Sequence, residues 1–159
     1  MTKNIFITDF SDPMFRTMFK QYFAELEINV KDWEGLFEEM NTHNGGNCAY
    51  IRFCDGKPAG FIQFTTVTLE NWFFKEKLGV FREFWVQKAL RRNGHGSALC
   101  SLAEKYFFDN GIRRIVLTAE EEAKEFYFRR GYVVCKGMEA MNNMDVWVKE
   151  YRGRRLWKK

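Results

Sequence analysis

The feature of this sequence that most constrains its fold is a glycine-rich turn between a predicted strand and a predicted helix. Residues 79–87 (GVFREFWVQ) are rich in β-forming side chains, and apolar residues recur at helical spacing over 97–110. Between these segments stand Gly94 and Gly96, one residue apart. Glycine tolerates tight turns and lets another group approach the main chain closely. A strand, a tight turn and a helix in this order indicate an α/β domain.

The remaining segments predict further strands and helices. Strands are expected at residues 4–10, on both sides of a turn at 55–58, at 113–117, at 132–138 and at 144–151. Helices are expected at 11–29, where Ser11 or Asp12 can cap the first turn, at 31–42, and from a capping box at 118–121 to Gly131. The predicted order is β-α-α-β-β-β-α-β-α-β-β, a mixed α/β fold with about six or seven strands and about four helices.

Length and charge indicate one domain with a basic tail. The 159 residues fit a single domain over 1–150, followed by a tail at 151–159. The whole chain has a formal net charge of +4, and most of the excess positive charge lies after residue 148. The near-neutral body argues against a nucleic-acid-binding module. The tail is interpreted as a solvated terminus, and contact with phosphate, lipid or nucleic acid is the alternative.

The cysteines and histidines do not form a metal-binding pattern. The four cysteines include no C-x-x-C pair, and neither His43 nor His95 stands at zinc-ligand spacing from a cysteine. Cys100 is expected to be a packed small residue rather than a nucleophile. The first residues lack the apolar run of a signal peptide, and no stretch approaches the ~18 apolar residues of a membrane span. We therefore expect no metal, no membrane contact, and a cytoplasmic protein with reduced thiols.

The glycine-rich turn could also hold an anion. The first turn of a helix has unpaired N–H donors and a partial positive charge, and Arg91 and Arg92 stand just before it. Two common phosphate motifs are absent. Gly96 is not followed by the Lys-Ser/Thr of a nucleoside-triphosphate loop, and Leu99 occupies the third glycine position of a dinucleotide fingerprint. The turn alone leaves two interpretations, a tight start to a helix or a ligand site.

Two segments together resemble a known family. Residues 86–99 (VQKALRRNGHGSAL) are similar to the coenzyme A loop of the GCN5-related N-acetyltransferases, in which a strand ending in Val precedes R/Q-x-x-G-x-G/A and a helix. Further along, residues 123–132 (AKEFYFRRGY) are similar to the family's A-x-x-L/F-Y-x-x-x-G-F/Y element. The resemblance covers most of the chain and is sharpest over 79–133. It implies a twisted, mostly antiparallel central sheet flanked by helices.

The resemblance also implies an activity. It indicates an acetyl-CoA-dependent N-acetyltransferase that transfers an acetyl group to a primary amine of a small molecule or peptide. In the family, the amine attacks the thioester directly. The alternative is a non-catalytic acyl-CoA-binding or regulatory domain of the same fold. The sequence does not reveal the acceptor or the oligomeric state, and a homodimer is one of the states it leaves open.

The coenzyme-contacting residues follow from the same resemblance. The loop amides would hold the pyrophosphate, and the pantetheine arm would lie along the strand ending at Trp85 and Val86, where two strands splay apart. The implied residues are Trp85, Val86, Arg91, Arg92, Asn93, Gly94, His95, Gly96, Ser97, Glu120, Ala123 and Tyr127. Only the backbone amide of His95 is expected to take part. Many relatives carry Asn where this chain has Glu120, and helix capping is the alternative role of that glutamate.

Two residues are implied to act in catalysis. Tyr127 matches a family tyrosine near the thioester sulfur, where a phenol can protonate the leaving thiolate. Its alternative role is packing in a buried helix stripe. Glu83 lies where many relatives carry a carboxylate that acts as a base through water, and its aromatic neighbours would raise its pKa by desolvation. The alternative is a solvated glutamate or an ion-pair partner of Arg82.

The acceptor site is the least constrained part of the prediction. In relatives, the first two helices and the loop before the fourth strand shape this site. The corresponding segments here are 11–29, 33–40 and 70–75. A glutamate facing the pocket from this loop, Glu70 or Glu76, would favour a cationic amine.

Overall fold

The computed structural model describes residues 1–42 and 46–151, and these contain one seven-stranded sheet and four α-helices. The strands are β1 (Thr2–Ile7), β2 (Cys48–Cys54), β3 (Lys57–Glu70), β4 (Lys75–Val86), β5 (Arg114–Leu117), β6 (Val133–Glu139) and β7 (Asp145–Glu150). The helices are α1 (Pro13–Glu25), α2 (Trp33–Thr42), α3 (His95–Asp109) and α4 (Lys124–Arg129), with short 3-10 helices η1 (Lys88–Leu90) and η2 (Glu121–Ala123). His43 and residues 152–159, most of the basic tail, lie outside the described residues.

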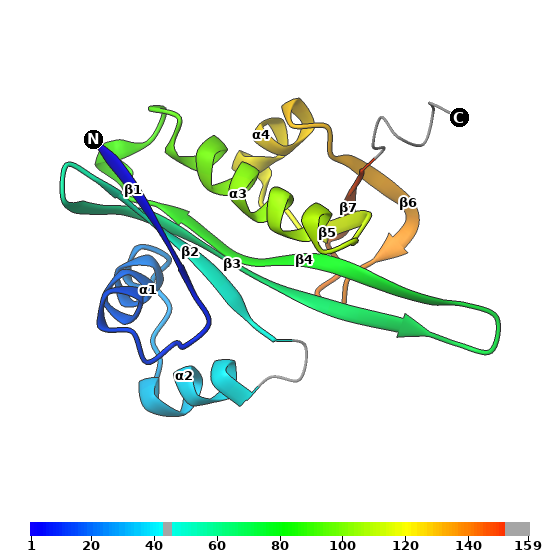
Figure 1. Cartoon of the computed structure of the whole chain (residues 1–159), viewed down its shortest axis with the longest axis horizontal. Helices are drawn as coiled ribbons and strands as arrows, with labels where there is room; N and C mark the ends of the chain where they lie inside the picture. Colours follow the sequence, from blue (N-terminus) through cyan, green and yellow to red (C-terminus); the bar gives the residue numbers. More distant parts are fainter. Residues whose placement is uncertain (43–45, 152–159) are drawn as a thin grey trace.

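The sheet confirms the predicted class and element order. Its strand order is β1-β2-β3-β4-β5-β7-β6, and every neighbouring pair is antiparallel except β4 and β5. Helices α1 and α2 lie on one face of the sheet, and α3 and α4 lie on the other (Figure 1). Each face therefore needs its own apolar core.

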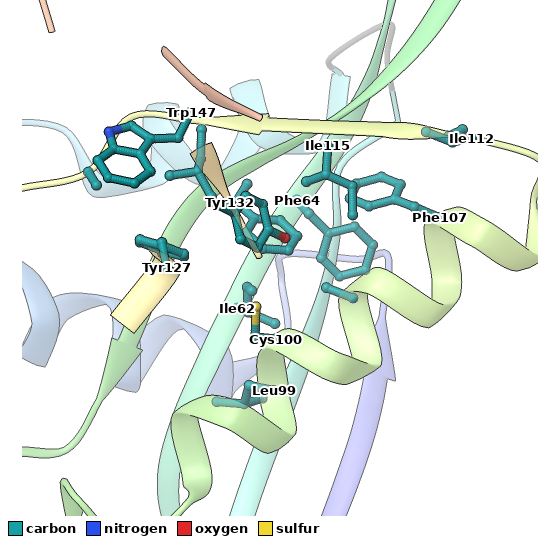
Figure 2. Packing of buried hydrophobic residues seen from close by; sticks show 14 of the residues in the cluster. Ile62, Phe64, Leu99, Cys100, Phe107, Ile112, Ile115, Tyr127, Tyr132 and Trp147 are labelled. Carbon is teal, nitrogen blue, oxygen red and sulfur yellow. The ribbon is translucent and has the colours of Figure 1, made fainter. Parts of the chain in front are cut away.

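Aromatic side chains dominate both cores. On the α1 face, Phe15 and Phe19 pack against Phe61 of β3, with ring centroids 5.2 and 5.8 Å apart. On the α3 face, Phe107 meets Phe64 of β3 at 5.2 Å, within the cluster drawn in Figure 2. Burying a side chain of this size contributes about 1.5–3 kcal/mol. The high Phe content thus supplies cores on both faces of the sheet.

Local sequence signals begin and end the helices largely as expected. The Asp12 side chain accepts the N–H of Phe15 at 2.9 Å and caps α1. Gly111 and Gly131 follow α3 and α4 with φ of 78° and 93°. This left-handed conformation terminates a helix and is accessible to glycine without steric cost.

The expected capping box at 118–121 is wrong. Helix α4 has only six residues and is entered through η2, where Glu120 makes no side-chain capping hydrogen bond. The Glu120 carbonyl instead accepts the N–H of Ala123 at 2.9 Å, which closes a 3-10 turn. Lys124 pairs with Glu121 at 2.7 Å across the same turn. A main-chain turn therefore replaces the predicted side-chain cap.

The hairpin formed by β3 and β4 is longer than predicted. Strand β4 begins at Lys75 rather than at residue 79. The side chain of Asn71 accepts the N–H groups of Phe73 and Phe74 at 2.7 and 3.0 Å, and this turn joins the two strands. Figure 1 shows the hairpin projecting beyond the body of the molecule.

Strands β4 and β5 diverge after a short parallel contact. Only two residue pairs join them, Gly79 with Ile115 and Val80 with Val116. Helix α3 packs closely at this point, because a Cβ on Gly79 would lie 2.7 Å from the Phe107 ring. Beyond it, the edge of β4 that faces β5 pairs with no strand among the described residues. This opening in the sheet confirms the predicted splay and positions the candidate site.

Candidate functional site

The loop between β4 and α3 presents a row of unpaired main-chain donors. Gly94, with φ of 83°, turns the chain into α3 without a side-chain cap. Within residues 1–42 and 46–151, no group accepts a hydrogen bond from the N–H groups of residues 92–97. These donors lie at the positive end of a fifteen-residue helix. The loop is therefore suited to bind an anion.

A cavity of about 820 Å³ lies against these donors. Its charged wall residues are Arg91, Arg92, Arg129, Arg130, Glu122 and Glu125. A Cβ on Gly96 would stand 3.5 Å from Phe84 and 3.8 Å from Phe126, which also border the cavity. The chain could therefore accept a side chain at residue 96, and glycine keeps this space open. Arg91, Arg129 and Arg130 are paired with carboxylates, and Arg92 forms no ion pair within the described residues. The Arg92 side chain, the free amides and the open space fit a phosphate-bearing ligand such as coenzyme A.

Most of the predicted coenzyme residues border this cavity. They are Val86, Arg91, Arg92, Gly94, Gly96, Ser97, Ala123 and Tyr127. The other four, Trp85, Asn93, His95 and Glu120, do not border it. The structure thus brings the two sequence motifs together around one space.

Two of the predicted coenzyme-contacting side chains bond to Glu25 of α1. Arg91 forms an ion pair with Glu25, and the Trp85 indole donates to the same carboxylate at 2.7 Å. Arg91 also donates to the Val86 carbonyl at 2.9 Å. Burial raises the pKa of Glu25, but the hydrogen bonds from Trp85 and Arg91 outweigh it, so the net pKa is lowered. Glu25 thereby fixes the loop to α1, a role that the sequence did not indicate.

Asn93 and His95 support the loop from behind. The Asn93 amide donates to the carbonyls of Leu90 and Arg91 at 3.2 Å. His95 is buried, and its Nδ1 accepts from the Nε of Arg52 on β2 at 3.0 Å. The His95 ring therefore faces the sheet rather than the cavity, which leaves its main chain as the part next to a ligand.

A second cavity, of about 360 Å³, meets the first at Tyr127. Phe84, Ala123 and Tyr127 border both spaces. The walls of the second cavity come from α1, the splayed ends of β4 and β5, and the turn between β6 and β7. Its charged residues are Arg82, Glu83 and Glu120. More arginines than glutamates therefore line the first cavity, and more glutamates than arginines line the second.

A bulge in β4 places Glu83 in the second cavity. Gln63 pairs with Glu83 and Phe64 pairs with Phe81, so Arg82 is the extra residue. Bulges change the direction in which a side chain points, and here the carboxylate borders the opening between β4 and β5. The bulge was not predicted, because no glycine or proline marks it in the sequence.

Glu83 is half-buried and bonded to α1. Its carboxylate accepts the hydroxyl of Tyr22 at 2.6 Å. Burial raises the pKa of Glu83 above its ordinary value, against the opposing effects of the Tyr22 hydrogen bond and of Arg82. The Glu83 side chain is therefore not freely solvated, and it forms no ion pair with Arg82. Tyr22 lies in the helix predicted over 11–29, and its hydrogen bond to Glu83 was not predicted.

Tyr127 stands at the junction of the cavities with its ring in the core. It packs edge-on against Tyr132, with centroids 5.5 Å apart, and belongs to the cluster shown in Figure 2. Burial, followed by the proximity of Cys100, raises the pKa of the phenol well above its ordinary value. Its hydroxyl has no hydrogen-bond partner in the part of the chain that the structure describes. A protonated donor is therefore available where the two cavities meet.

The acceptor-side expectations need correction. Glu120 borders the second cavity, and residues 70–75 do not border it. The loop was expected to shape this site, but the long β3–β4 hairpin carries it away from the opening (Figure 1). Glu76 pairs with Arg114 at 3.4 Å instead of facing the pocket. Helix α2 borders a smaller space of about 120 Å³ that adjoins Glu83.

The described residues do not support a cysteine nucleophile or a metal centre in this site. Burial raises the pKa of the Cys100 thiol to about 12, which keeps it protonated and unreactive. No three His, Cys, Asp or Glu residues within 1–42 and 46–151 are grouped so that they could hold a metal ion. None of the described helices combines the length and apolar character needed to cross a bilayer.

The sequence matches a family model. The model of the Acetyltransferase (GNAT) family matches residues 7–132. This range includes the loop, Glu83 and Tyr127, but not β6 and β7. No curated protein matches the sequence significantly.

Solved acetyltransferases share the fold at low sequence identity. A predicted acetyltransferase from Clostridium acetobutylicum, solved with acetyl-CoA, is 13% identical with a TM-score of 0.74, and the match covers 89% of this chain and 96% of that one. PaiA N-acetyltransferase from Thermoplasma acidophilum, with coenzyme A, is 16% identical with a TM-score of 0.63, covering 94% and 99%. An aminoglycoside acetyltransferase from an uncultured soil metagenomic sample, with sisomicin, is 17% identical with a TM-score of 0.64, covering 81% and 85%.

Proposed function

Because this chain belongs to the GNAT acetyltransferase family, we propose that it transfers an acetyl group from acetyl-CoA to a primary amine by direct attack on the thioester. One observation carries the proposal: a positively lined cavity and a negatively lined cavity meet at the protonated phenol of Tyr127. This arrangement gives an anionic donor and a cationic acceptor separate routes to one point. The acceptor is a small molecule or a peptide amine.

The first cavity is the proposed donor side. The N–H groups of residues 92–97 and the side chain of Arg92 bind the pyrophosphate. The edge of β4 that β5 leaves open supplies main-chain partners for the pantetheine amides. Gly96 keeps its Cβ position free, so the phosphates can approach the main chain. These residues bind and orient the coenzyme and do not react with it.

The second cavity is the proposed acceptor side. An amine is mostly protonated near neutral pH, and Glu83 and Glu120 favour binding of the resulting cation. Aromatic side chains from α1 and β4, including Tyr22 and Phe84, add a wall that suits a cation. The charge of Arg82 leaves a net single negative charge in the cavity when both glutamates are ionised.

Three proton transfers complete the reaction. Glu83, directly or through water, accepts a proton from the bound ammonium and later returns it to solvent, and the raised pKa of Glu83 brings it closer to neutral pH, where a base is most effective. The neutral amine nitrogen forms a bond to the acetyl carbon as the carbon–sulfur bond breaks, and the nitrogen releases its second proton to solvent as the neutral amide forms. Tyr127 donates its hydroxyl proton to the sulfur that leaves, and solvent then restores that proton.

The proposal is tested by binding and turnover measured separately. Acetyl-CoA, coenzyme A and desulfo-coenzyme A should each raise the melting temperature, since a ligand that binds only the folded state stabilises it. Free thiol should then appear only when an amine is added. Binding without thiol release for any amine would favour a non-catalytic acyl-CoA-binding domain, and absence of any stabilisation would reject both functions.

A further inference from the structure

The exposed apolar side chains of the β3–β4 hairpin point to an interaction surface. Trp72 and Phe73 at its tip are 98% and 93% exposed, and Leu69 and Phe74 beside them are about half exposed. The side-chain turn at Asn71 holds this tip in one conformation. Soluble monomers rarely expose such a cluster of large apolar side chains without a function. A defined turn that holds two aromatic rings in solvent is suited to insertion into a partner.

The same chain contains an apolar groove that could receive the tip. The groove, of about 630 Å³, lies between the hairpin and strands β5, β7 and β6. Apolar side chains form most of its wall, among them Leu78, Val116, Met138, Val146 and Val148. Arg114, its one arginine, is paired with Glu76 and Glu150 of the same chain at 3.4 Å. The groove thus offers an apolar partner a surface on which the arginine is already neutralised.

We propose that this surface is a homodimer interface in which each copy inserts Trp72 and Phe73 into the groove of the other. The groove runs along the hairpin from Leu69 and Phe74, beside the tip, to Leu78, and it continues onto β5, β6 and β7. Two hairpins packed antiparallel about a twofold axis therefore bring each tip to the end of the other copy's groove that Leu78 and Val116 line. Such an exchange is self-complementary and closed, so it ends at a dimer rather than a filament.

The area available is sufficient for a stable dimer. An enclosed aromatic side chain buries about 150–250 Å². The four rings contributed by two copies therefore bury roughly 600–1,000 Å², and the groove walls that they cover add a comparable area. The sum falls within the 1,200–2,000 Å² typical of stable interfaces. A lipid surface is less favoured as the occupant, because the hairpin bears Glu70 and Glu76 together with Lys75 and Lys77.

The interface also adjoins the proposed acceptor side. Met138 and Val146 of the groove belong to β6 and β7, and the turn between these strands supplies Asn142 and Met144 to the second cavity. Dimer formation does not depend on the proposed function. An experiment that rejects the dimer therefore leaves the proposed function standing, and the reverse also holds.

Sedimentation velocity over a range of protein concentrations provides the first test. The unmodified chain should sediment as a dimer, and a Trp72→Ser, Phe73→Ser double variant should raise the dimer dissociation constant at least about a hundredfold. Its melting temperature in dilute solution, where both proteins are monomeric, should be unchanged because these rings make no core contacts. Phe128→Ser, which removes an exposed ring from α4, is the matched control and should keep the dimer. A monomeric unmodified chain, or a dimer unaffected by the double variant, would overturn the proposal.

A cross-link test fixes the arrangement of the dimer. Cys135 borders the groove and is unpaired. Phe73→Cys should therefore form a disulfide between copies, from residue 73 to residue 135, on treatment with diamide, and mass spectrometry of the peptides should identify it. Adding Cys135→Ser should abolish the link. A disulfide joining residue 73 of both copies would show that the tips meet each other and would contradict insertion into the groove.

Discussion

At the residue scale, the proposed proton donor Tyr127 and the proposed base Glu83 lie in two different environments. Tyr127 lies in the core, where burial keeps its phenol protonated over the whole working pH range. Glu83 lies in a half-buried position, where burial raises its pKa and the Tyr22 hydrogen bond limits the rise. The proposed donor is thereby kept protonated, and the pKa of the proposed base is moved upward, in the direction that suits proton acceptance near neutral pH.

Replacing Tyr127 with Phe should lower kcat by about a hundredfold while leaving acetyl-CoA affinity within about twofold, because only a proton donor is removed. Steady-state kinetics and calorimetric titration measure the two quantities. Tyr132→Phe is the control: its hydroxyl bonds Glu104 at 2.8 Å, so its loss should reduce stability rather than kcat. Equal kcat in Tyr127→Phe and the unmodified protein would exclude the donor role.

The pH profile should report the state of Glu83. A base acts only when ionised, so kcat/KM should rise with pH through the raised pKa of Glu83. Tyr22→Phe removes the hydrogen bond that lowers this pKa and should shift the acidic limb to higher pH. Glu83→Gln should reduce kcat/KM and abolish this limb. An acidic limb that stays unchanged in Glu83→Gln would assign it to another group.

The long-range hydrogen bonds of the site could not be predicted, although Glu83 and Trp85 themselves were among the predicted site residues. Tyr127 and the glycines belong to local motifs whose spacing is visible in the sequence. Tyr22 and Glu83 are separated by 61 positions, and Glu25 and Trp85 by 60. These bonds exist because α1 packs over β4, and a single sequence carries no signal of that pairing.

At the element scale, Gly96 in the first turn of α3 leaves free the space beside the cavity that a side chain would occupy. A methyl group there would make ordinary contacts of 3.5 and 3.8 Å, and alanine suits a helix better than glycine. Leucine is also a good helix former, and its side chain would extend from residue 96 into the cavity that Gly96 borders. Gly96→Leu should therefore keep thermal stability but weaken coenzyme A binding at least about tenfold, or about 1.4 kcal/mol, whereas Gly96→Ala, which the family motif allows, should change the affinity little. Calorimetric titration with coenzyme A measures this change.

Gly111→Ala provides the matched control for that variant. Gly111 has φ of 78° at the other end of the same helix, so alanine there is strained. This change should lower stability and leave coenzyme A affinity unchanged. Unaltered coenzyme A affinity in Gly96→Leu would mean that the ligand does not approach this turn.

A buried carboxylate joins α3, α4 and β7. Glu104, only 6% exposed, accepts hydrogen bonds from Arg130 at 2.6 Å, Tyr132 at 2.8 Å and Lys149 at 2.9 Å. Glu104→Ala would leave two cations without their partner and should reduce the free energy of unfolding by about 3–5 kcal/mol. Urea denaturation measures this loss. Lys105→Ala removes only an exposed pair with Asp109 and should have little effect; a similarly small effect of Glu104→Ala would contradict the structural role of this cluster.

Element type was predictable here, and element boundaries were not. Hydrophobic periodicity gave all four helices and seven strands in the right order, because both faces of the sheet need apolar stripes. The extended β3–β4 hairpin and the short α4 depended on turns at Asn71 and Glu120. Main-chain hydrogen bonding, rather than side-chain type, decided the start of α4.

At the scale of the whole molecule, the two cavities of the proposed site differ in the charged residues that line them. The loop and α4 line one cavity with an excess of arginine, and α1, β4 and β5 line the other with an excess of glutamate. The two spaces exist because β4 and β5 separate beyond Val80 and Val116. In the proposed reaction, this charge pattern would direct donor and acceptor to different sides of Tyr127.

The most direct test of this account compares 1,4-diaminobutane with 4-aminobutyrate as acceptors in acetyl-CoA-dependent thiol release. The two molecules present the same primary amine on the same four-carbon chain and differ only in the charge of the other end. The account predicts amine-dependent thiol release with kcat/KM at least about tenfold higher for the diamine, a preference that Glu120→Gln should reduce. Equal use of both acceptors, or preference for 4-aminobutyrate, would contradict a cation-selective acceptor cavity.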